Sequence, residues 1–537
     1  MLNVGQTYSV TIEDTNIYAK GVCHIDNMVV FVDGAITEEE CDVIITKVYP
    51  RYAYANCVGI LKSSAHRIIP TCKYFGNCGG CAFSHITLDF ENLVKYNYVK
   101  SAFKKQGIEA KIDEIACPVS RNYRNKVVLF FDGERFGYMA KATNKIVSHN
   151  SCELNDEVFD KIADFTAKEL KGNSLRALYL RKSSHKEPEI MVCPVFYKSV
   201  DMLSYVSKLV NEFPNVKTVL ASLYKEKDFA LENAKFKVVY GDGYINDVLC
   251  GLNFRISPES FYQVNHDCAE ILYEKAIELA KLNDSTVCAD LFCGTGTIGI
   301  ISAHKTGATV YGVEIVESAV EDAKYNAKSN GVKNAFFKAT DASEFDKQVD
   351  VCIVDPPRKG CSTFMIDTLK RLKPRKIVYV SCNTDTLVRD VKALSEFYQI
   401  ATPVSIFNLF PRTSHVESVV CLCDKSYLHS MKLDQAPFEK IKDGEKTIEL
   451  RLFDEKRQRL RVGDEIVFLC RNTGEQIIKR IEKLHLFENF EELYKNMPLL
   501  KCGYTAENVA KASFSDMEAY YSKEDQKKYG VVGIELS

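Results

Sequence analysis

The sequence lacks the features that mark membrane, secreted or repetitive proteins. No uninterrupted apolar run approaches about 18 residues, the length of a membrane-spanning helix, and no signal-peptide pattern opens the chain. Obvious repeats and low-complexity tracts are absent, and the formal net charge of the 537 residues is only -2. We therefore expect a cytoplasmic protein with no membrane partner, in which any surface that binds nucleic acid is a local basic patch.

What the chain does have is length, apolar content and cysteine. Its 537 residues are 46% hydrophobic, which suffices for three or four domains of roughly 150 residues each. In a reducing compartment its 20 cysteines are not expected to form disulfides. Most cysteines are ordinary small buried residues, so only those with a special spacing point to metal ligation or catalysis.

Strand and helix patterns divide the chain into four predicted parts. Short strands separated by turns fill residues 1–62, as in a small β-barrel. Residues 63–254 mix strands with a Lys-rich helical stretch, and we predict an α+β fold for them. In residues 255–426 apolar strands alternate with helices, which predicts an α/β domain with a doubly wound, mostly parallel sheet that binds ligands beyond its carboxyl strand ends. Residues 430–537, with strands and a basic segment, suggest a second small barrel.

A glycine-rich turn follows the first strand of the α/β region. The segment CADLFCGTGTIGI holds three glycines in GxGxxG spacing: Gly294, Gly296 and Gly299. Absent side chains and free N–H groups admit a ligand there, and Glu314 at the end of the next strand is placed to bind both hydroxyls of a ribose. This pattern alone suits a nicotinamide dinucleotide or S-adenosylmethionine equally well. Asp290 before the turn, and Asp355 in the rigid segment VDPPRKG, favour S-adenosylmethionine.

A cysteine ends the fifth strand of this region, in the segment IVYVSCNTDTLVRD. Cys382 is followed by Asn383, Thr384 and Asp385, which can cap the next helix. A thiol at a helix N-terminus has its thiolate stabilised. We therefore expect Cys382 to be a nucleophile.

A thiolate beside a methyl-donor site suits attack on an electron-poor ring. Addition of the thiolate at C6 of uracil makes C5 nucleophilic enough to accept a methyl group, after which a base must remove the C5 proton. The segment FPRTSHVESVV offers His415 and Glu417 as candidates for that base.

A second group of cysteines has the spacing of metal ligands. The segment CKYFGNCGGC contains Cys72, Cys78 and Cys81, and Cys152 follows far along the chain. Four thiolates suit either tetrahedral zinc or an iron–sulfur cluster. Three clustered cysteines with one distant partner are more typical of the cluster, and Cys152 is the weakest member on spacing alone.

Four motifs in order, DLFCGTG, DPPRKG, SCNTDTLVRD and PRTSHVES, resemble those of the RNA uracil-5-methyltransferase family. The resemblance covers roughly residues 3–425 and implies a Rossmann-like class I domain that uses S-adenosylmethionine. It implies that Cys382 is the nucleophile, that Glu417 is the base, and that Asp355 also borders the target base. The positions that match cofactor contacts are Gln263, Phe292, Gly294, Gly296, Thr297, Glu314, Asp341 and Asp355.

The same resemblance bears on the cysteines and on the RNA target. It implies a [4Fe-4S] cluster held by Cys72, Cys78, Cys81 and Cys152. Thr297 and Asp341 stand where some members carry asparagine. The N-terminal barrel resembles the OB-like, RNA-binding TRAM domain of members that act on ribosomal RNA. Members specific for the transfer-RNA T-loop generally lack both that domain and the cysteines, so we expect 23S ribosomal RNA as the substrate and a monomeric enzyme.

The C-terminal part resembles the ASCH domain, a PUA-like barrel associated with RNA. Its basic residues are candidates for phosphate contacts: Lys446, Arg451, Lys456, Arg457, Arg459 and Arg461. Some stand-alone relatives hydrolyse acylated cytidine. Lys446 fits their pattern, but Glu449 stands where they place a threonine, so a second activity is not expected.

Three other functions are compatible with parts of the sequence. The first is methylation of uracil in transfer RNA. The second is a dinucleotide-dependent oxidoreductase that passes electrons through an iron–sulfur cluster, which would leave Cys382 and Glu417 without a role. The third is a non-catalytic RNA-binding assembly factor with a barrel at each end, which would bind RNA without consuming a cofactor.

Overall fold

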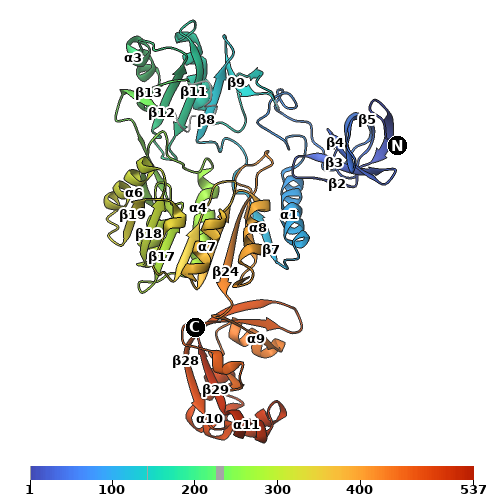
Figure 1. Cartoon of the computed structure of the whole chain (residues 1–537), viewed down its shortest axis with the longest axis vertical. Helices are drawn as coiled ribbons and strands as arrows, with labels where there is room; N and C mark the ends of the chain where they lie inside the picture. The colour runs from blue at the N-terminus through green and yellow to red at the C-terminus, as the bar shows by residue number, and fades with distance from the viewer. Residues whose placement is uncertain (1, 142, 225–234) are drawn as a thin grey trace. The chain divides into compact units, whose positions relative to one another are not determined.

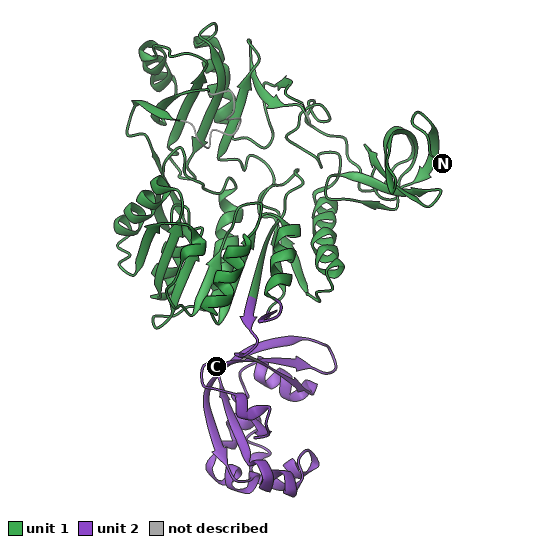
Figure 2. Cartoon of the chain, viewed as in Figure 1, with its two compact units in different colours: residues 1–394, 402–421 green, residues 395–401, 422–537 purple. Residues whose placement is uncertain are grey.

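The computed structural model describes residues 2–141, 143–224 and 235–537. The chain divides into two compact units (Figure 2). One contains Met1–Leu394 and Thr402–Cys421, and the other contains Ser395–Ala401 and Leu422–Ser537. Among the described residues, no helix combines the length and apolar character needed to cross a membrane.

The N-terminal β-strands form a six-stranded sheet, as the spacing of turns predicts. Its order is β1 (Thr7–Thr11), β5 (Glu40–Val48), β6 (Tyr52–Lys62), β4 (Met28–Asp33), β3 (Lys20–Ile25) and β2 (Asp14–Thr15). Alternate residues of β3, β4 and β5 point into one core, which includes Val30, Val32, Val43 and Ala53. Strands β4 and β6 run parallel, and the other neighbouring pairs run antiparallel.

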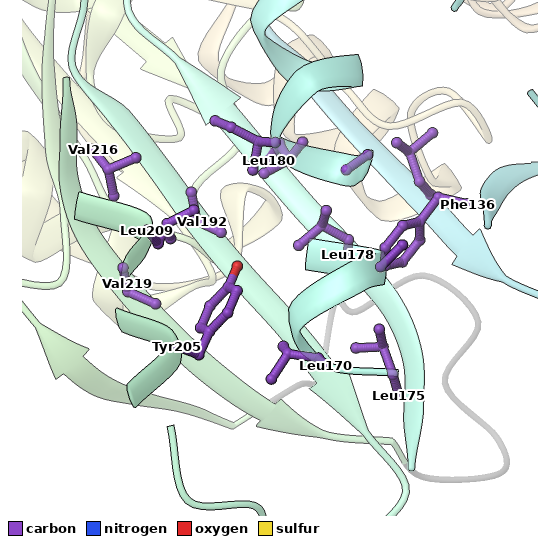
Figure 3. Packing of buried hydrophobic residues seen from close by; sticks show 14 of the residues in the cluster. Phe136, Leu170, Leu175, Leu178, Leu180, Val192, Tyr205, Leu209, Val216 and Val219 are labelled. Carbon is purple, nitrogen blue, oxygen red and sulfur yellow. The ribbon is translucent and has the colours of Figure 1, made fainter. Parts of the chain in front are cut away.

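A second sheet lies in the middle of the chain, with two helices against it. Its order is β10 (Ile146–Ser148), β9 (Phe136–Met139), β8 (Lys126–Phe131), β11 (Leu175–Lys182), β12 (Ile190–Phe196), β13 (Val216–Leu223) and β14 (Phe236–Tyr240). Helices α2 (Glu157–Glu169) and α3 (Leu203–Glu212) bury their apolar residues against the central strands (Figure 3). The Tyr205 hydroxyl, inside this core, is hydrogen-bonded to Thr166 at 2.8 Å.

The third sheet confirms the predicted doubly wound α/β fold. Its order is β19 (Ala335–Ala339), β18 (Thr309–Glu314), β17 (Val287–Leu291), β20 (Val351–Val354), β21 (Lys376–Ser381), β24 (Glu417–Asp424), β23 (Val404–Phe407) and β7 (Ile112–Ala116), and β22 (Tyr398–Ile400) pairs with β24. Strands β17 to β21 are parallel, whereas β24 is antiparallel to β23. The helices of this part are α4 (His266–Ala280), α5 (Thr297–Thr306), α6 (Glu317–Ser329), α7 (Thr363–Leu372) and α8 (Thr384–Leu394) (Figure 1). A hairpin of β15 (Ile245–Leu249) and β16 (Leu252–Ile256) precedes α4.

One strand of this sheet comes from a part of the chain that the sequence patterns place elsewhere. Strand β7 lies within residues 63–254, yet it pairs in parallel with β23. Helix α1 (Leu88–Lys105), which precedes it, packs on β7 and α8 (Figure 1). The region that carries the first three spaced cysteines is thereby joined to the α/β sheet.

The second unit has a five-stranded sheet of its own. Its order is β25 (Leu428–Leu433), β27 (Glu465–Cys470), β28 (Gln476–Phe487), β29 (Val531–Leu536) and β26 (Ile448–Leu452), with helices α9 (Gln435–Lys442), α10 (Phe490–Asn496) and α11 (Lys523–Tyr529). Three of the basic residues predicted to contact phosphate form ion pairs within this unit. Lys446 and Arg451 both bind the buried Glu449, at 2.7 and 2.8 Å, and Arg457 binds Asp454 at 2.8 Å. Lys456, Arg459 and Arg461 are exposed.

Candidate active site

The glycine-rich turn joins β17 to α5 and has the backbone conformation that its glycines predict. Gly296 lies at φ 78° and caps α5. A Cβ atom on Gly296 would come within 2.9 Å of the Phe337 ring, so no larger residue fits. The N–H of Gly294 donates to Oε2 of Glu314 at 3.2 Å, and the N–H of Gly299 donates to Oδ2 of Asp290 at 2.8 Å. The turn is therefore fixed by the two carboxylates at the ends of β17 and β18.

Three carboxyl groups gather where β17, β18 and β20 end. Burial raises the pKa of Asp290 to about 7, and the nearby charge of Glu314 adds to the effect. Burial and the charge of Asp290 raise the pKa of Asp355, also to about 7. A site with this many carboxylates favours a ligand with a positive centre, such as a sulfonium, and disfavours the pyrophosphate of a dinucleotide.

Two other residues predicted to contact the cofactor share a partner. The side chains of Gln263 and Thr297 are buried and both act to lower the pKa of Tyr273, which lies on α4. Phe292, next to the turn, has φ 68° and donates its N–H to the carbonyl of Val313 at 3.0 Å. These three residues therefore lie around the glycine-rich turn.

Asp341, at the end of β19, is exposed and caps the short helix Ala342–Glu344. It accepts hydrogen bonds from the backbone and the hydroxyl of Ser343, at 2.8 and 2.7 Å. These hydrogen bonds lower the pKa of its carboxyl group.

Cys382 directly follows β21 and is half-buried. Asn383 caps α8, because its Oδ1 accepts the N–H of Asp385 at 3.0 Å. The net effect of the surroundings on this thiol is nevertheless a raised pKa, although a backbone hydrogen bond at Cys382 acts to lower it. Burial, and then the charges of Glu417 and Asp355, raise the pKa of the Cys382 thiol to about 11. Two nearby carboxylates and a desolvated site outweigh one helix N-terminus.

The two candidate bases differ in their surroundings. Glu417 begins β24 and is buried, and burial together with the charge of Asp355 raises the pKa of its carboxyl group to about 8. Burial and the charge of Arg358 lower the pKa of His415 to about 4. Glu417 is therefore the stronger proton acceptor of the two.

Arg358 is a site residue that the sequence reasoning did not single out. Its Nη2 lies 2.9 Å from Nε2 of His415, and its carbonyl accepts a hydrogen bond from Nδ2 of Asn383 at 3.1 Å. Its charge lowers the pKa values of both Cys382 and Glu417, against the larger raising effects. The signal available in the sequence was its place in DPPRKG, three residues after Asp355.

The loop before Glu417 is held from several sides. Nζ of the fully buried Lys95, on α1, donates to Oε1 of Glu91 at 2.8 Å and to Oδ1 of Asn408 at 2.6 Å. The carbonyl of Arg412 accepts the N–H groups of Ala82 and Phe83. The side-chain amide of Asn265 also donates a hydrogen bond to the carbonyl of Leu409, and the hydroxyl of Tyr123 donates one to the carbonyl of Pro411, each at 3.0 Å.

A cavity of about 580 Å³ opens beside this loop. Arg358, Phe410 and His415 line one part of it, and Tyr18 and Lys20 of the N-terminal β domain line another. Its other cationic lining residues are Arg124, Lys126 and Lys141. The cavity is therefore strongly basic, which suits a polyanion such as RNA.

The four spaced cysteines line one small cavity of about 30 Å³: Cys72, Cys78, Cys81 and Cys152. Arg124 and His149 share this cavity. Within the described part of the chain, no three or more His, Cys, Asp or Glu side chains form a group that could hold a metal ion. The structure thus brings the four thiols to one place without showing a metal centre.

Models of three protein families match the chain: the TRAM domain over residues 2–58, tRNA (uracil-5-)-methyltransferase over residues 198–351, and a methyltransferase domain over residues 282–484. An uncharacterized RNA methyltransferase of Oceanobacillus iheyensis is 32% identical over 450 residues, covering 78% of this chain and 96% of its own. Another, from Caldanaerobacter subterraneus, is 34% identical and covers 78% of this chain and 98% of its own.

A solved structure agrees with these relatives. The crystal structure of Pyrococcus abyssi tRNA (uracil-54, C5)-methyltransferase in complex with S-adenosyl-L-homocysteine is similar with a TM-score of 0.63 and 25% identity, over 77% of this chain and 100% of that one. The fold and the site define a class I S-adenosylmethionine-dependent methyltransferase. The chain belongs to the RNA uracil-5-methyltransferase family, as a member with an N-terminal TRAM domain.

Proposed function

We propose that this enzyme methylates C5 of specific uridines in 23S ribosomal RNA, with Cys382 as the nucleophile and Glu417 as the base. The observation that carries this proposal is the convergence of three groups on one site. The pKa of the Cys382 thiol responds to the charges of Glu417 and Asp355, and the charge of Arg358 lowers the pKa values of both Cys382 and Glu417. A thiol, a buried carboxyl group and a cation at one site suit addition and elimination on a ring.

The reaction balances with these residues. The Cys382 thiolate adds to C6 of uracil and makes C5 nucleophilic, and S-adenosylmethionine supplies a methyl group from a cationic sulfur. The Glu417 carboxylate then removes the C5 proton, and the C6–S bond breaks to return the thiolate. Because its carboxyl pKa is about 8, Glu417 is a stronger base than an ordinary glutamate. We assign cofactor contacts to Gln263, Phe292, Gly294, Gly296, Thr297, Glu314, Asp341 and Asp355.

The proposed RNA target rests on the N-terminal barrel and the spaced cysteines, which resemble those of members that act on ribosomal RNA. Transfer RNA is the second candidate, because the matching family model and the similar Pyrococcus abyssi enzyme are both described as acting on tRNA uracil. The two candidates make opposite predictions for the RNA that is methylated, and adduct formation with each RNA separates them.

We further propose that Cys72, Cys78, Cys81 and Cys152 hold a [4Fe-4S] cluster. Two features support it: the four thiols face one cavity, and Arg124, in the same cavity, would offset part of the negative charge of the cluster. The cluster would stabilise the protein or position RNA, since methyl transfer requires no electrons. Anaerobically purified protein should contain about four iron and four sulfide ions per chain with a broad absorbance near 400 nm. Zinc without iron would contradict the assignment.

We propose the same domain boundaries as the sequence patterns suggest, with an ASCH domain at residues 430–537 that contacts RNA. Lys456, Arg459 and Arg461 are the exposed cations available for phosphate. Glu449 is already bound by Lys446 and Arg451, which supports a structural role for these three residues.

The first experiment uses 23S ribosomal RNA fragments in which uridine is replaced by 5-fluorouridine. Fluorine cannot be removed as a proton, so the enzyme remains bonded to the RNA. We expect a protein–RNA adduct labelled by methyl-labelled S-adenosylmethionine on a denaturing gel, absent with Cys382→Ala. An adduct with transfer RNA alone would replace the proposed target, and no adduct with either RNA would refute the proposed chemistry.

A further inference from the structure

Four aromatic side chains gather on the outer surface of the N-terminal barrel. We call them the aromatic platform: Phe31, Tyr49, Tyr52 and Tyr54. The parallel pairing of β4 with β6 places Phe31 beside Tyr54, with ring centroids 5.7 Å apart. Tyr49, in the turn between β5 and β6, stacks on Tyr52 with centroids 4.9 Å apart. The rings thus form one continuous surface from two strands and a turn.

The platform is not part of the barrel core. The core lies on the other face of β4 and β6, among residues such as Val30, Val32 and Ala53, whereas Phe31, Tyr52 and Tyr54 are half-buried. Tyr49 is 41% exposed. Among the hydrogen bonds of the described residues, none uses the hydroxyls of Tyr49, Tyr52 or Tyr54. Cross-strand packing alone would not require four aromatic rings to gather on one outer face.

Positive charge borders the platform and links it to the site. Nζ of Lys20 lies 5.4 Å from the centroid of the Tyr54 ring. Lys20 and Lys141 both pair with Asp33, which leaves an excess of one positive charge. Both lysines also line the 580 Å³ cavity that contains Arg358 and His415. A strand of RNA in that cavity can therefore continue onto the platform without leaving cationic surface.

We propose that the aromatic platform binds bases of single-stranded RNA that flank the methylated uridine. Aromatic rings in a cationic groove bind successive bases by stacking, with little dependence on sequence. The platform would then hold unpaired bases beside the target, while Lys20 contacts the phosphates between them. The position of these bases beside the target rests on the proposed function, whereas stacking itself requires no uridine.

The test measures binding of the full-length chain to two fluorescein-labelled oligonucleotides of roughly 12 nucleotides, within the span of such sites. One is oligoadenylate, and the other has the same backbone but no bases. We expect wild type to prefer the oligoadenylate by about tenfold, and the Tyr49→Leu/Tyr52→Leu variant to lose this preference, since stacking on one ring is worth roughly 1–3 kcal/mol per base. Lys20→Gln should weaken binding of both oligonucleotides equally. It should also reduce the slope of log affinity against log salt concentration by about one.

The control is Tyr240→Leu, because Tyr240 lies on β14 and is 42% exposed, close to the exposure of Tyr49. The single variant Tyr49→Leu changes a turn residue, so it tests the platform even where the double variant unfolds. Equal preference in wild type and Tyr49→Leu, or no preference in wild type, would overturn the proposal. Oligoadenylate contains no uridine, so failure of the adduct experiment would not affect the measured preference for oligoadenylate. Loss of that preference would likewise not affect the adduct experiment.

Discussion

The carbonyl oxygen of Arg412 accepts the N–H of Ala82 at 2.7 Å, and that of Phe83 at 3.1 Å. These bonds join the loop that contains Cys81 to the loop that leads into Glu417, although more than three hundred residues separate them. Arg412 has φ 68°, a left-handed conformation that costs energy and persists only where surroundings hold it. The cysteine loop is part of what holds it.

A substitution that disturbs the cysteine loop should therefore impair the base Glu417 more than the cofactor site. We expect Cys81→Ser to lower turnover by roughly ten- to a hundredfold, as changes to supporting residues commonly do, with the affinity for S-adenosylmethionine unchanged. Turnover assays and calorimetric titration measure the two effects. Cys57→Ser, in the N-terminal barrel, is the control. Normal turnover in a Cys81→Ser protein that lacks iron would show that the cysteine loop does not support the base Glu417.

Lys95 should be essential for the stability of the first unit. Its ammonium group is fully buried and bonded to Glu91 and Asn408, so Lys95→Met leaves the buried Glu91 carboxylate with only the more distant cation of Arg412, at 3.6 Å. We expect a loss of about 3–5 kcal/mol in unfolding free energy, measured by denaturant titration. Lys324→Met, which breaks the exposed pair with Glu321 at 2.8 Å, should change stability by no more than about 0.5 kcal/mol. Equal effects of the two variants would contradict this account.

Replacement of Glu417 by glutamine should stop the reaction after methyl transfer. Removing a general base lowers the rate of proton transfer by about 10²–10⁴-fold. With RNA that contains ordinary uridine, a labelled protein–RNA adduct should therefore accumulate with Glu417→Gln and be absent with wild type. His415→Gln should keep turnover, because the low pKa of His415 makes it a poor base. Rapid turnover by Glu417→Gln would assign the proton transfer to His415.

The same variant should change the pH dependence of adduct formation. The charge of Glu417 contributes to the raised pKa of the Cys382 thiol, so its removal lowers that pKa and increases the thiolate fraction at a given pH. As the pH is raised, the single-turnover rate of Glu417→Gln should therefore begin to increase at a lower pH than that of wild type. Identical profiles would show that burial alone sets the reactivity of the thiol.

Affinity for the methyl donor should increase from pH 6 to pH 8. The carboxyl groups of Asp290 and Asp355 have pKa values of about 7, so they are mostly neutral below that pH and mostly charged above it. Only the charged forms attract a sulfonium. Calorimetric titration should show a several-fold gain for S-adenosylmethionine and a smaller gain for S-adenosylhomocysteine, whose sulfur is neutral. Parallel curves for the two ligands would exclude this electrostatic selection.

Removal of residues 426–537 should weaken RNA binding without affecting the cofactor site. A chain that ends at Lys425 keeps β24 and its pairing with β22. We expect unchanged affinity for S-adenosylmethionine and weaker binding of RNA, with a shallower dependence on salt because phosphate contacts are lost. Unchanged RNA affinity at several salt concentrations would leave residues 430–537 with a structural or unrelated role.

Much of the fold follows from local patterns. The strand–helix alternation predicted a mostly parallel sheet, and the GxGxxG spacing predicted the turn at Gly296, because periodicity, glycine and helix caps act over a few residues. The place of β7 could not be predicted in this way. Its five residues take their place in the sheet by pairing with β23, almost three hundred residues later.

The sequence by itself determined the elements, the glycine turn and the candidates Cys382, Glu417 and the four spaced cysteines. Only the tertiary structure decided how those groups behave. It placed carboxylates beside Cys382 and raised the pKa of its thiol, whereas the helix N-terminus alone predicted the opposite. It also brought Arg358 to His415 and Arg412 to Ala82. The physical reason is that desolvation and charge depend on everything that surrounds a group, and those surroundings come from distant parts of the chain.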